Sequence, residues 1–97
     1  MEIKGIMKER FATQSGVSER SGNSWRTDSY LMTIPGSREK HIAFEVRGEE
    51  RCKGWEEFLK NLPANTPVLV KFEIDARMYQ DRWFNTVEAW NIEVTNW

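Results

Sequence analysis

Apolar and polar residues alternate along several stretches of the chain, which is the pattern of a strand buried on one face. Residues 40–48 show the alternation most clearly, with Ile42, Phe44 and Val46 on one side and mostly polar residues on the other. The same period of two predicts three further strands, over residues 2–13, 25–35 and 66–79.

The last part of the chain changes phase within one apolar run, which predicts an irregular strand. Val87 and Ala89 share one parity, whereas Trp90 and Ile92 share the other. One extra residue near this point explains the shift, because a β-bulge moves the following side chains to the opposite face. Residues 83–97 are therefore expected to form a fifth strand with a bulge at 89–90.

The period changes from two to about 3.6 after the third predicted strand. Four apolar residues recur there at helical spacing: Trp55, Phe58, Leu59 and Leu62. We expect an amphipathic helix over 50–62, which Pro63 ends because proline cannot continue the hydrogen-bond pattern. Small and polar residues predict a flexible loop over 14–24 and a short turn over 80–82.

The predicted order is three strands, one helix and a two-stranded hairpin. This order is typical of the OB-fold, an all-β, five-stranded, partly open Greek-key barrel with its helix between strands three and four. Gly5 and the bulge in the last strand supply the bends that a small barrel needs in order to close. An open α+β sheet with one helix packed on it is the alternative. No repeat or linker divides residues 1–97, so we expect one domain.

The charges nearly cancel, since 14 Lys and Arg stand against 15 Asp and Glu. This balance argues against a protein that is basic overall, so any nucleic-acid contact must come from a local basic surface. The lone Cys52 cannot form an internal disulfide, and with the lone His41 it builds no standard metal site. Charged residues interrupt each apolar stretch near the N-terminus, so we expect neither a signal peptide nor a membrane span. These features predict a cytoplasmic protein without metal or cofactor.

Catalytic signatures give no support for an enzyme. The motifs GxSxG, GxxxxGKS/T, HExxH, CxxC and GxGxxG are all absent from the sequence. His41 and Cys52 fall on different predicted elements, and Cys52 is expected to be a small core or boundary residue rather than a nucleophile. Glu73 and Asp75 share a strand face, as paired catalytic carboxylates can, but they lie on the solvated side. We therefore predict a non-enzymatic protein.

Four segments resemble a bacterial family of short domains of unknown function: MEIKG at 1–5, Ser24-Trp25-Arg26, IAFEVRG at 42–48 and RWFNTVEAWNIE at 82–93. That family is regarded as similar to single-stranded DNA-binding proteins of the OB-fold type. The resemblance runs over most of the chain and is weakest across the predicted helix. It implies the barrel fold and single-stranded DNA as a partner, whereas it implies no particular activity.

The aromatic residues divide into two groups. Four fall on apolar phases and are expected in the core: Phe44, Trp55, Phe58 and Phe72. Trp25 instead lies on the polar side of its strand, and Tyr79, Trp83 and Phe84 crowd the tip of the last hairpin. OB-folds bind ligands across strands two and three, between the loops that join strands one to two and four to five. We expect a nucleic-acid site along this surface, built from Trp25, Arg26, His41, Arg47, Arg77, Tyr79, Arg82 and Trp83.

Unpaired nucleic acid suits these side chains, because aromatic faces stack on bases while arginines follow phosphates. Other roles compete with this one. Trp83 and Trp90 could seal the barrel, and Arg77 could pair with a neighbouring carboxylate. Three carboxylates on the same outer faces would repel a phosphate backbone: Glu45, Glu73 and Asp75.

Our leading hypothesis is a small OB-fold module that binds single-stranded DNA and assembles into a homo-oligomer, which adds weak sites together. We expect no membrane partner and no small-molecule cofactor. The alternative is an oligomerisation or protein–protein interaction module with no nucleic-acid binding, since exposed aromatics and arginines are also common in protein interfaces. Trp97 at the end of the sequence could contribute to such contacts.

Overall fold

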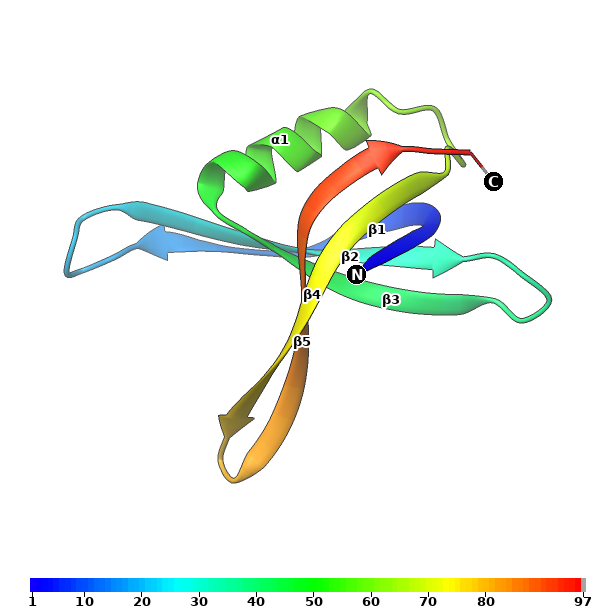
Figure 1. Ribbon diagram of the computed structural model, residues 1–97. Helices are drawn as coiled ribbons and strands as arrows, with labels where there is room; N and C mark the ends of the chain where they lie inside the picture. Colours follow the sequence, from blue (N-terminus) through cyan, green and yellow to red (C-terminus); the bar gives the residue numbers. More distant parts are fainter. Residues whose placement is uncertain (97) are drawn as a thin grey trace.

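Five strands close into a barrel in the computed structural model, which describes residues 1–96 (Figure 1). The elements are β1 (Glu2–Val17), β2 (Ser24–Ile34), β3 (Lys40–Arg47), α1 (Glu49–Lys60), β4 (Val68–Tyr79) and β5 (Arg82–Val94). Around the barrel the strand order is β1-β2-β3-β5-β4, and β4 returns to β1. All pairs are antiparallel except β3 and β5. The chain therefore has the predicted OB-fold, and the open sheet is excluded. Trp97 lies outside the described residues.

Side chains from the inward faces of the strands meet α1 in one core. The rings of Phe44 and Phe72 lie 5.7 Å apart, and those of Tyr30 and Trp55 lie 5.5 Å apart. Trp55 is buried and Phe58 packs half-buried against the same cluster, as the helical spacing predicts. Figure 1 shows α1 lying across one end of the barrel. Within residues 1–96, no helix is long and apolar enough to cross a membrane.

Cys52 is fully buried, so of the two expected positions, core or boundary, it occupies the core. Its thiol donates a hydrogen bond to the Val46 carbonyl oxygen at 3.1 Å. Burial raises the pKa of the Cys52 thiol, so the reactive thiolate is disfavoured. The geometry thus gives this cysteine a packing role.

β1 changes its neighbour at Gly5. Residues 2–5 pair with β4, and from Ile6, opposite Thr33, the strand pairs with β2. Gly5 is buried at this crossing, where an added Cβ would lie 2.7 Å from the Thr33 carbonyl oxygen and 2.8 Å from the Met32 sulfur. The missing side chain lets β1 approach β2 closely at this point. The change of partner from β4 to β2 corresponds to the bend that the sequence predicts at this glycine.

Gly5→Ala is expected to lower the free energy of unfolding by about 1–3 kcal/mol, because a backbone carbonyl cannot move aside for the new methyl group. Urea denaturation measures the change. Gly54→Ala is the matched control, since a Cβ at this helical position meets nothing within 4 Å. It should raise stability by roughly 0.5–1 kcal/mol. Equal effects of the two substitutions would contradict the crowding at Gly5.

The β1–β2 hairpin extends as an arm beyond the barrel (Figure 1). The two strands stay paired out to Val17 and Ser24, so the connecting loop spans only 18–23. The predicted loop over 14–24 was therefore too long. Residues on this arm are mostly exposed on both faces, so a polar composition there is compatible with a strand.

The β4–β5 hairpin forms a second arm, which points away from the barrel in another direction (Figure 1). Tyr79 pairs with Arg82, and the turn between them contains only two residues. Gln80 and Asp81 have φ values of 49° and 63°. Two successive positive φ angles are typical of a type I′ turn, whose twist matches that of the flanking strands.

Beyond Phe72 this hairpin leaves the core. Ile74 continues the alternation of Val68, Val70 and Phe72, yet it is exposed because no other element within residues 1–96 covers this stretch. The predicted bulge is confirmed: Ala89 and Asn91 pair with consecutive residues of β4, which leaves Trp90 between them without a partner. The bulge lies where the hairpin bends into the barrel wall.

Tyr30 is 3% exposed, and its hydroxyl has no hydrogen-bond partner among the described residues. Burial raises the pKa of Tyr30 from 10.0 to about 12. The unfolded chain therefore loses this proton at a lower pH than the folded chain. The protonated Tyr30 hydroxyl therefore makes its full contribution to the free energy of unfolding below about pH 10. That free energy falls as the pH rises toward 12, by up to about 1.4 kcal/mol per pH unit.

Tyr30→Phe is expected to flatten this alkaline loss of stability, because phenylalanine has no proton to release. At neutral pH the variant should be at least as stable as the parent, since it removes an unpaired buried hydroxyl. Urea unfolding between neutral pH and about pH 11 measures both effects. A variant that loses stability with pH as steeply as the parent would show that another group controls the alkaline transition.

Candidate nucleic-acid interface

The two arms enclose an open angle on one side of the barrel (Figure 1). A depression of about 260 Å³ lies between the strands from which the second arm extends and β3. Residues of β3, β4 and β5 line it, including Arg47, Arg77 and Glu88. Directly paired residues share a sheet face, so the register extends this surface along both arms. We call it the groove face; it comprises Trp25, Thr27, Glu45, Arg47, Glu73, Asp75, Arg77, Tyr79, Arg82, Phe84, Thr86 and Glu88.

Trp25 provides an aromatic surface on the β1–β2 arm. It lies two residues before Thr27, which pairs with Arg47, so all three side chains share the groove face. The indole lies against Gly16, its partner on β1, where an added Cβ would come within 3.0 Å of the ring. The missing side chain at Gly16 gives the ring room, and Trp25 remains 45% exposed.

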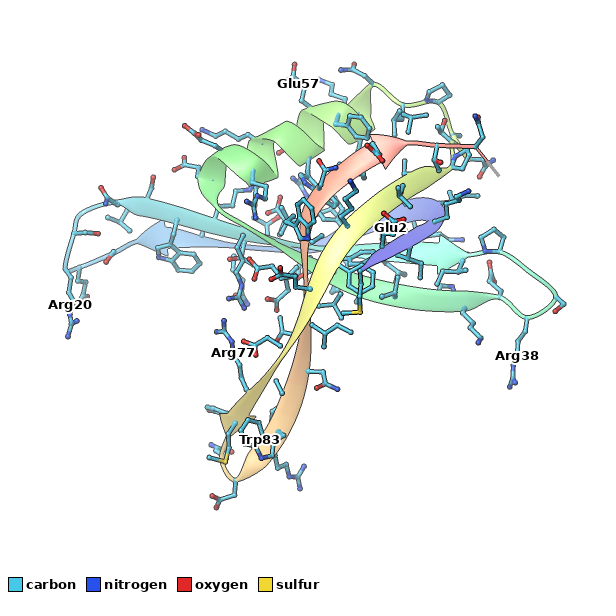
Figure 2. All side chains as sticks on the ribbon, viewed as in Figure 1. Glu2, Arg20, Arg38, Glu57, Arg77 and Trp83 are labelled. Carbon is cyan, nitrogen blue, oxygen red and sulfur yellow. The ribbon has the colours of Figure 1, made fainter. Side chains whose placement is uncertain are left out.

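The tip of the β4–β5 hairpin combines aromatic rings with arginines on the groove face. Tyr79 pairs with Arg82, and two residues closer to the barrel Arg77 pairs with Phe84. Tyr79 is 66% exposed and Phe84 is also exposed. Figure 2 shows Arg77 leaving the hairpin on the side of the β1–β2 arm. Each arm thus carries at least one solvent-exposed ring on the same face of the sheet.

Trp83 lies on the opposite face of this hairpin. It pairs with Met78, and neighbouring residues in a strand point to opposite sides. The prediction that Trp83 borders the same surface as Tyr79 and Arg82 is therefore corrected. The alternative in which tryptophans seal the barrel is also wrong, since Trp83 is 69% exposed and Trp90 is exposed as well.

Carboxylates occupy the floor of the groove face. Glu88 on β5 pairs with Glu45 on β3 and with Glu73 on β4, which places three acidic residues side by side across the strands. Negative charge at the floor would repel phosphates. Any nucleic acid on this face is therefore expected to contact the arms more closely than the floor.

Two arginines of the groove face already have acidic partners. Arg47 donates hydrogen bonds to Glu45, the shorter at 3.0 Å, and Arg77 lies 3.8 Å from Asp75. Surface ion pairs of this kind contribute only about 0–1 kcal/mol, so a phosphate can replace the carboxylate at small cost. The pairing of Arg77 with a neighbouring carboxylate, which the sequence left open, is thus present in the structure.

Arg26 turns away from the groove face, which corrects its predicted position. Its guanidinium donates to both carboxylate oxygens of Asp28 at 2.9 Å each, and to Glu56 of α1 at 2.7 Å. Arg10 of β1 lies 3.1 Å from the same Glu56. The carboxylates raise the pKa of Arg26, and the two arginines hold the pKa of Glu56 below its usual range. Arg26 ties β2 to α1.

His41 lies at the far end of β3, opposite Thr33. Arg47 is six positions further along β3, which is about 20 Å along a strand. The side chain is exposed but distant from both arms. Of the eight predicted site residues, the structure brings five together on the groove face: Trp25, Arg47, Arg77, Tyr79 and Arg82.

Sequence reasoning missed two contributors to this surface. Phe84 is adjacent to Trp83 and was not among the eight, yet the hairpin register places it beside Arg77. Gly16 shapes the seat of Trp25, and in the sequence it looks like an ordinary loop glycine. Counting outward from a two-residue turn at 80–81 would have found Phe84, because that turn fixes which residues pair.

A family model described as "Domain of unknown function (DUF3127)" matches residues 2–93. The chain belongs to this family. The DUF3127 match includes both arms and every residue of the groove face. Among curated proteins, none matches the chain by sequence.

Solved structures of single-stranded DNA-binding proteins resemble the DUF3127 chain. The mitochondrial protein Rim1 from S. cerevisiae superposes with a TM-score of 0.63 at 14% identity, covering 97% of this chain and 91% of that one. The small protein from Streptomyces coelicolor gives 0.47 at 6% identity, with 98% and 94% covered. The small protein from Mycoplasma pneumoniae gives 0.43 at 12% identity, with 99% and 90% covered. The likeness to Rim1 establishes a shared fold, as the resemblance in the sequence implied.

Proposed function

We propose that the chain is a non-enzymatic OB-fold module that binds single-stranded DNA across its two arms. The observation that carries this proposal is the shared orientation of Trp25 on one arm and Tyr79 on the other, both exposed on the groove face. Bases stack on such rings without regard to sequence. Arg82 and Arg77 lie beside the rings of the second arm and supply charges for the phosphates.

The acidic floor shapes how this binding works. The groove face holds three arginines against four carboxylates, so attraction of the whole surface for phosphate is weak. Affinity then depends on stacking at the arms and on several copies acting together, because linked weak sites gain avidity. We include a homo-oligomer in the proposal for this reason.

Fluorescence anisotropy of a labelled oligo-dT of about 16 nucleotides tests the proposal. We expect saturable binding that weakens with salt, with a slope of about −2 in a plot of log affinity against log salt, since three arginines meet phosphates on a single strand. Double-stranded DNA of the same length is the control and should bind more weakly, because its bases are already stacked. Absence of binding at tens of micromolar protein and low salt would refute the proposal.

A second candidate function is self-association through the opposite face of the β4–β5 hairpin. Met78 and Trp83 pair there, and both are largely exposed. Exposed apolar pairs on a projecting arm are typical of protein interfaces. Light scattering of the parent and of a Met78→Ser/Trp83→Ser variant tests it. Loss of assembly with unchanged affinity for oligo-dT would assign this face to protein contacts, and unchanged assembly would remove the candidate.

A further inference from the structure

We propose that a cavity beside the C-terminal end of α1 binds a small amphipathic carboxylate, a molecule with an apolar body and one carboxylate group. The cavity has a volume of about 360 Å³ and lies between β1, α1 and the segment that connects α1 to β4. None of its lining residues belongs to the groove face. Its size is within the range of pockets that bind small molecules.

The walls suit an apolar body. The apolar part of the lining consists of Ile6 and Met7 of β1, Leu59 of α1, Leu62 and Val68 of β4. Leu59 and Leu62 pack only partly buried against the core, so part of their apolar surface remains in contact with water. A bound hydrocarbon would cover this surface, which is the usual source of affinity in such pockets.

Tyr30 gives the cavity a buried polar group that lacks a partner. It contributes to the wall, it is nine-tenths or more buried, and its hydroxyl makes no hydrogen bond within residues 1–96. Buried hydroxyls are nearly always paired in folded proteins, so an unpaired one calls for an explanation. A ligand oxygen supplies the missing partner once a flexible neighbour turns aside, and the unbranched Met7 in the same lining repacks readily.

The charges at the rim favour a negative group. Lys8 and Lys60 line the cavity and form no salt bridge in the described part of the chain. Arg10 and Glu56 are also in the lining but bind each other at 3.1 Å. Glu9 is the one remaining carboxylate of the lining, so the rim keeps an excess of one positive charge. A carboxylate at the two lysines balances this excess.

Octanoate, 1-octanol and octylamine share one alkyl chain and differ in charge, so they are the probes. Titrations followed in ¹H–¹⁵N spectra of the full chain should show saturable shifts at Leu59, Ala64 and neighbouring lining residues. Octanoate should bind most tightly and octylamine most weakly. Lys8→Gln/Lys60→Gln should weaken octanoate about fivefold, while Lys40→Gln/Lys53→Gln, an equal charge change outside the lining, should leave it unchanged.

Tyr30→Phe separates a role in binding from a role in folding. The variant keeps the ring in the core, and we expect it to fold with at least the parent's stability while binding octanoate several-fold more weakly. Shifts that are absent from the lining residues would overturn the proposal. Equal affinity for octanoate and octylamine, or octanoate binding unaffected by both the lysine and the tyrosine variants, would overturn it as well.

Discussion

Replacing Trp25 or Tyr79 by alanine is expected to weaken binding of oligo-dT by about 5- to 150-fold in each case, which corresponds to the loss of one stacked base at roughly 1–3 kcal/mol. Both rings are exposed on the groove face, one on each arm. Neither contributes to the core, so both variants should fold normally. Anisotropy titrations of the two variants beside the parent measure the effect.

Trp83→Ala is the matched control for Tyr79→Ala. The two residues lie at the same hairpin tip with nearly equal exposure, 69% and 66%, but on opposite faces. We expect Trp83→Ala to leave the affinity for oligo-dT within about twofold of the parent, since a residue outside the contact surface contributes little. If Trp83→Ala lowers the affinity as much as Tyr79→Ala does, the DNA is not confined to the groove face and our account is contradicted.

Asp28→Ala is expected to lower the free energy of unfolding by about 3–5 kcal/mol, because it leaves the charge of Arg26 without its main partner. The Asp28 carboxylate is fully buried and accepts two hydrogen bonds from Arg26. The guanidinium of Arg10 lies 3.7 Å from the same carboxylate. This network joins β1, β2 and α1 at the root of the first arm. Urea denaturation at neutral pH measures the loss.

Glu56→Gln provides the comparison for Asp28→Ala. Glu56 binds the same two arginines from an exposed position, so its loss should cost no more than about 1 kcal/mol. Similar losses in the two variants would indicate that the pairing itself, rather than the burial of Asp28, sets the energy of this network.

Most of the barrel could be predicted from residue periodicity, because strand burial imposes a period of two and the helix a period of 3.6. The phase change between Ala89 and Trp90 even located the bulge. These signals come from local contact with a core. They end where the core ends, so they do not show that Ile74 lies beyond the core or that residues 14–17 belong to a paired arm.

The candidate site was harder to predict, because it depends on which partner each side chain meets. The sequence places Arg26 beside Trp25 in the predicted site, but the Arg26 guanidinium instead donates two hydrogen bonds to the buried Asp28, two positions later. The faces of Trp83 and Tyr79 depend on the length of the turn between the two strands. A two-residue turn sets their register, whereas the sequence alone suggested three residues.

The central claim is that single-stranded DNA lies across both arms on the groove face. Chemical-shift mapping in ¹H–¹⁵N spectra with oligo-dT of about 16 nucleotides tests it most directly. The account predicts saturable shifts at the indole N–H of Trp25 and at the amides of Arg77, Tyr79 and Arg82, with the indole of Trp83 and the amide of His41 nearly unchanged. Shifts centred on Trp83 and Met78, or no shifts on either arm, would contradict it.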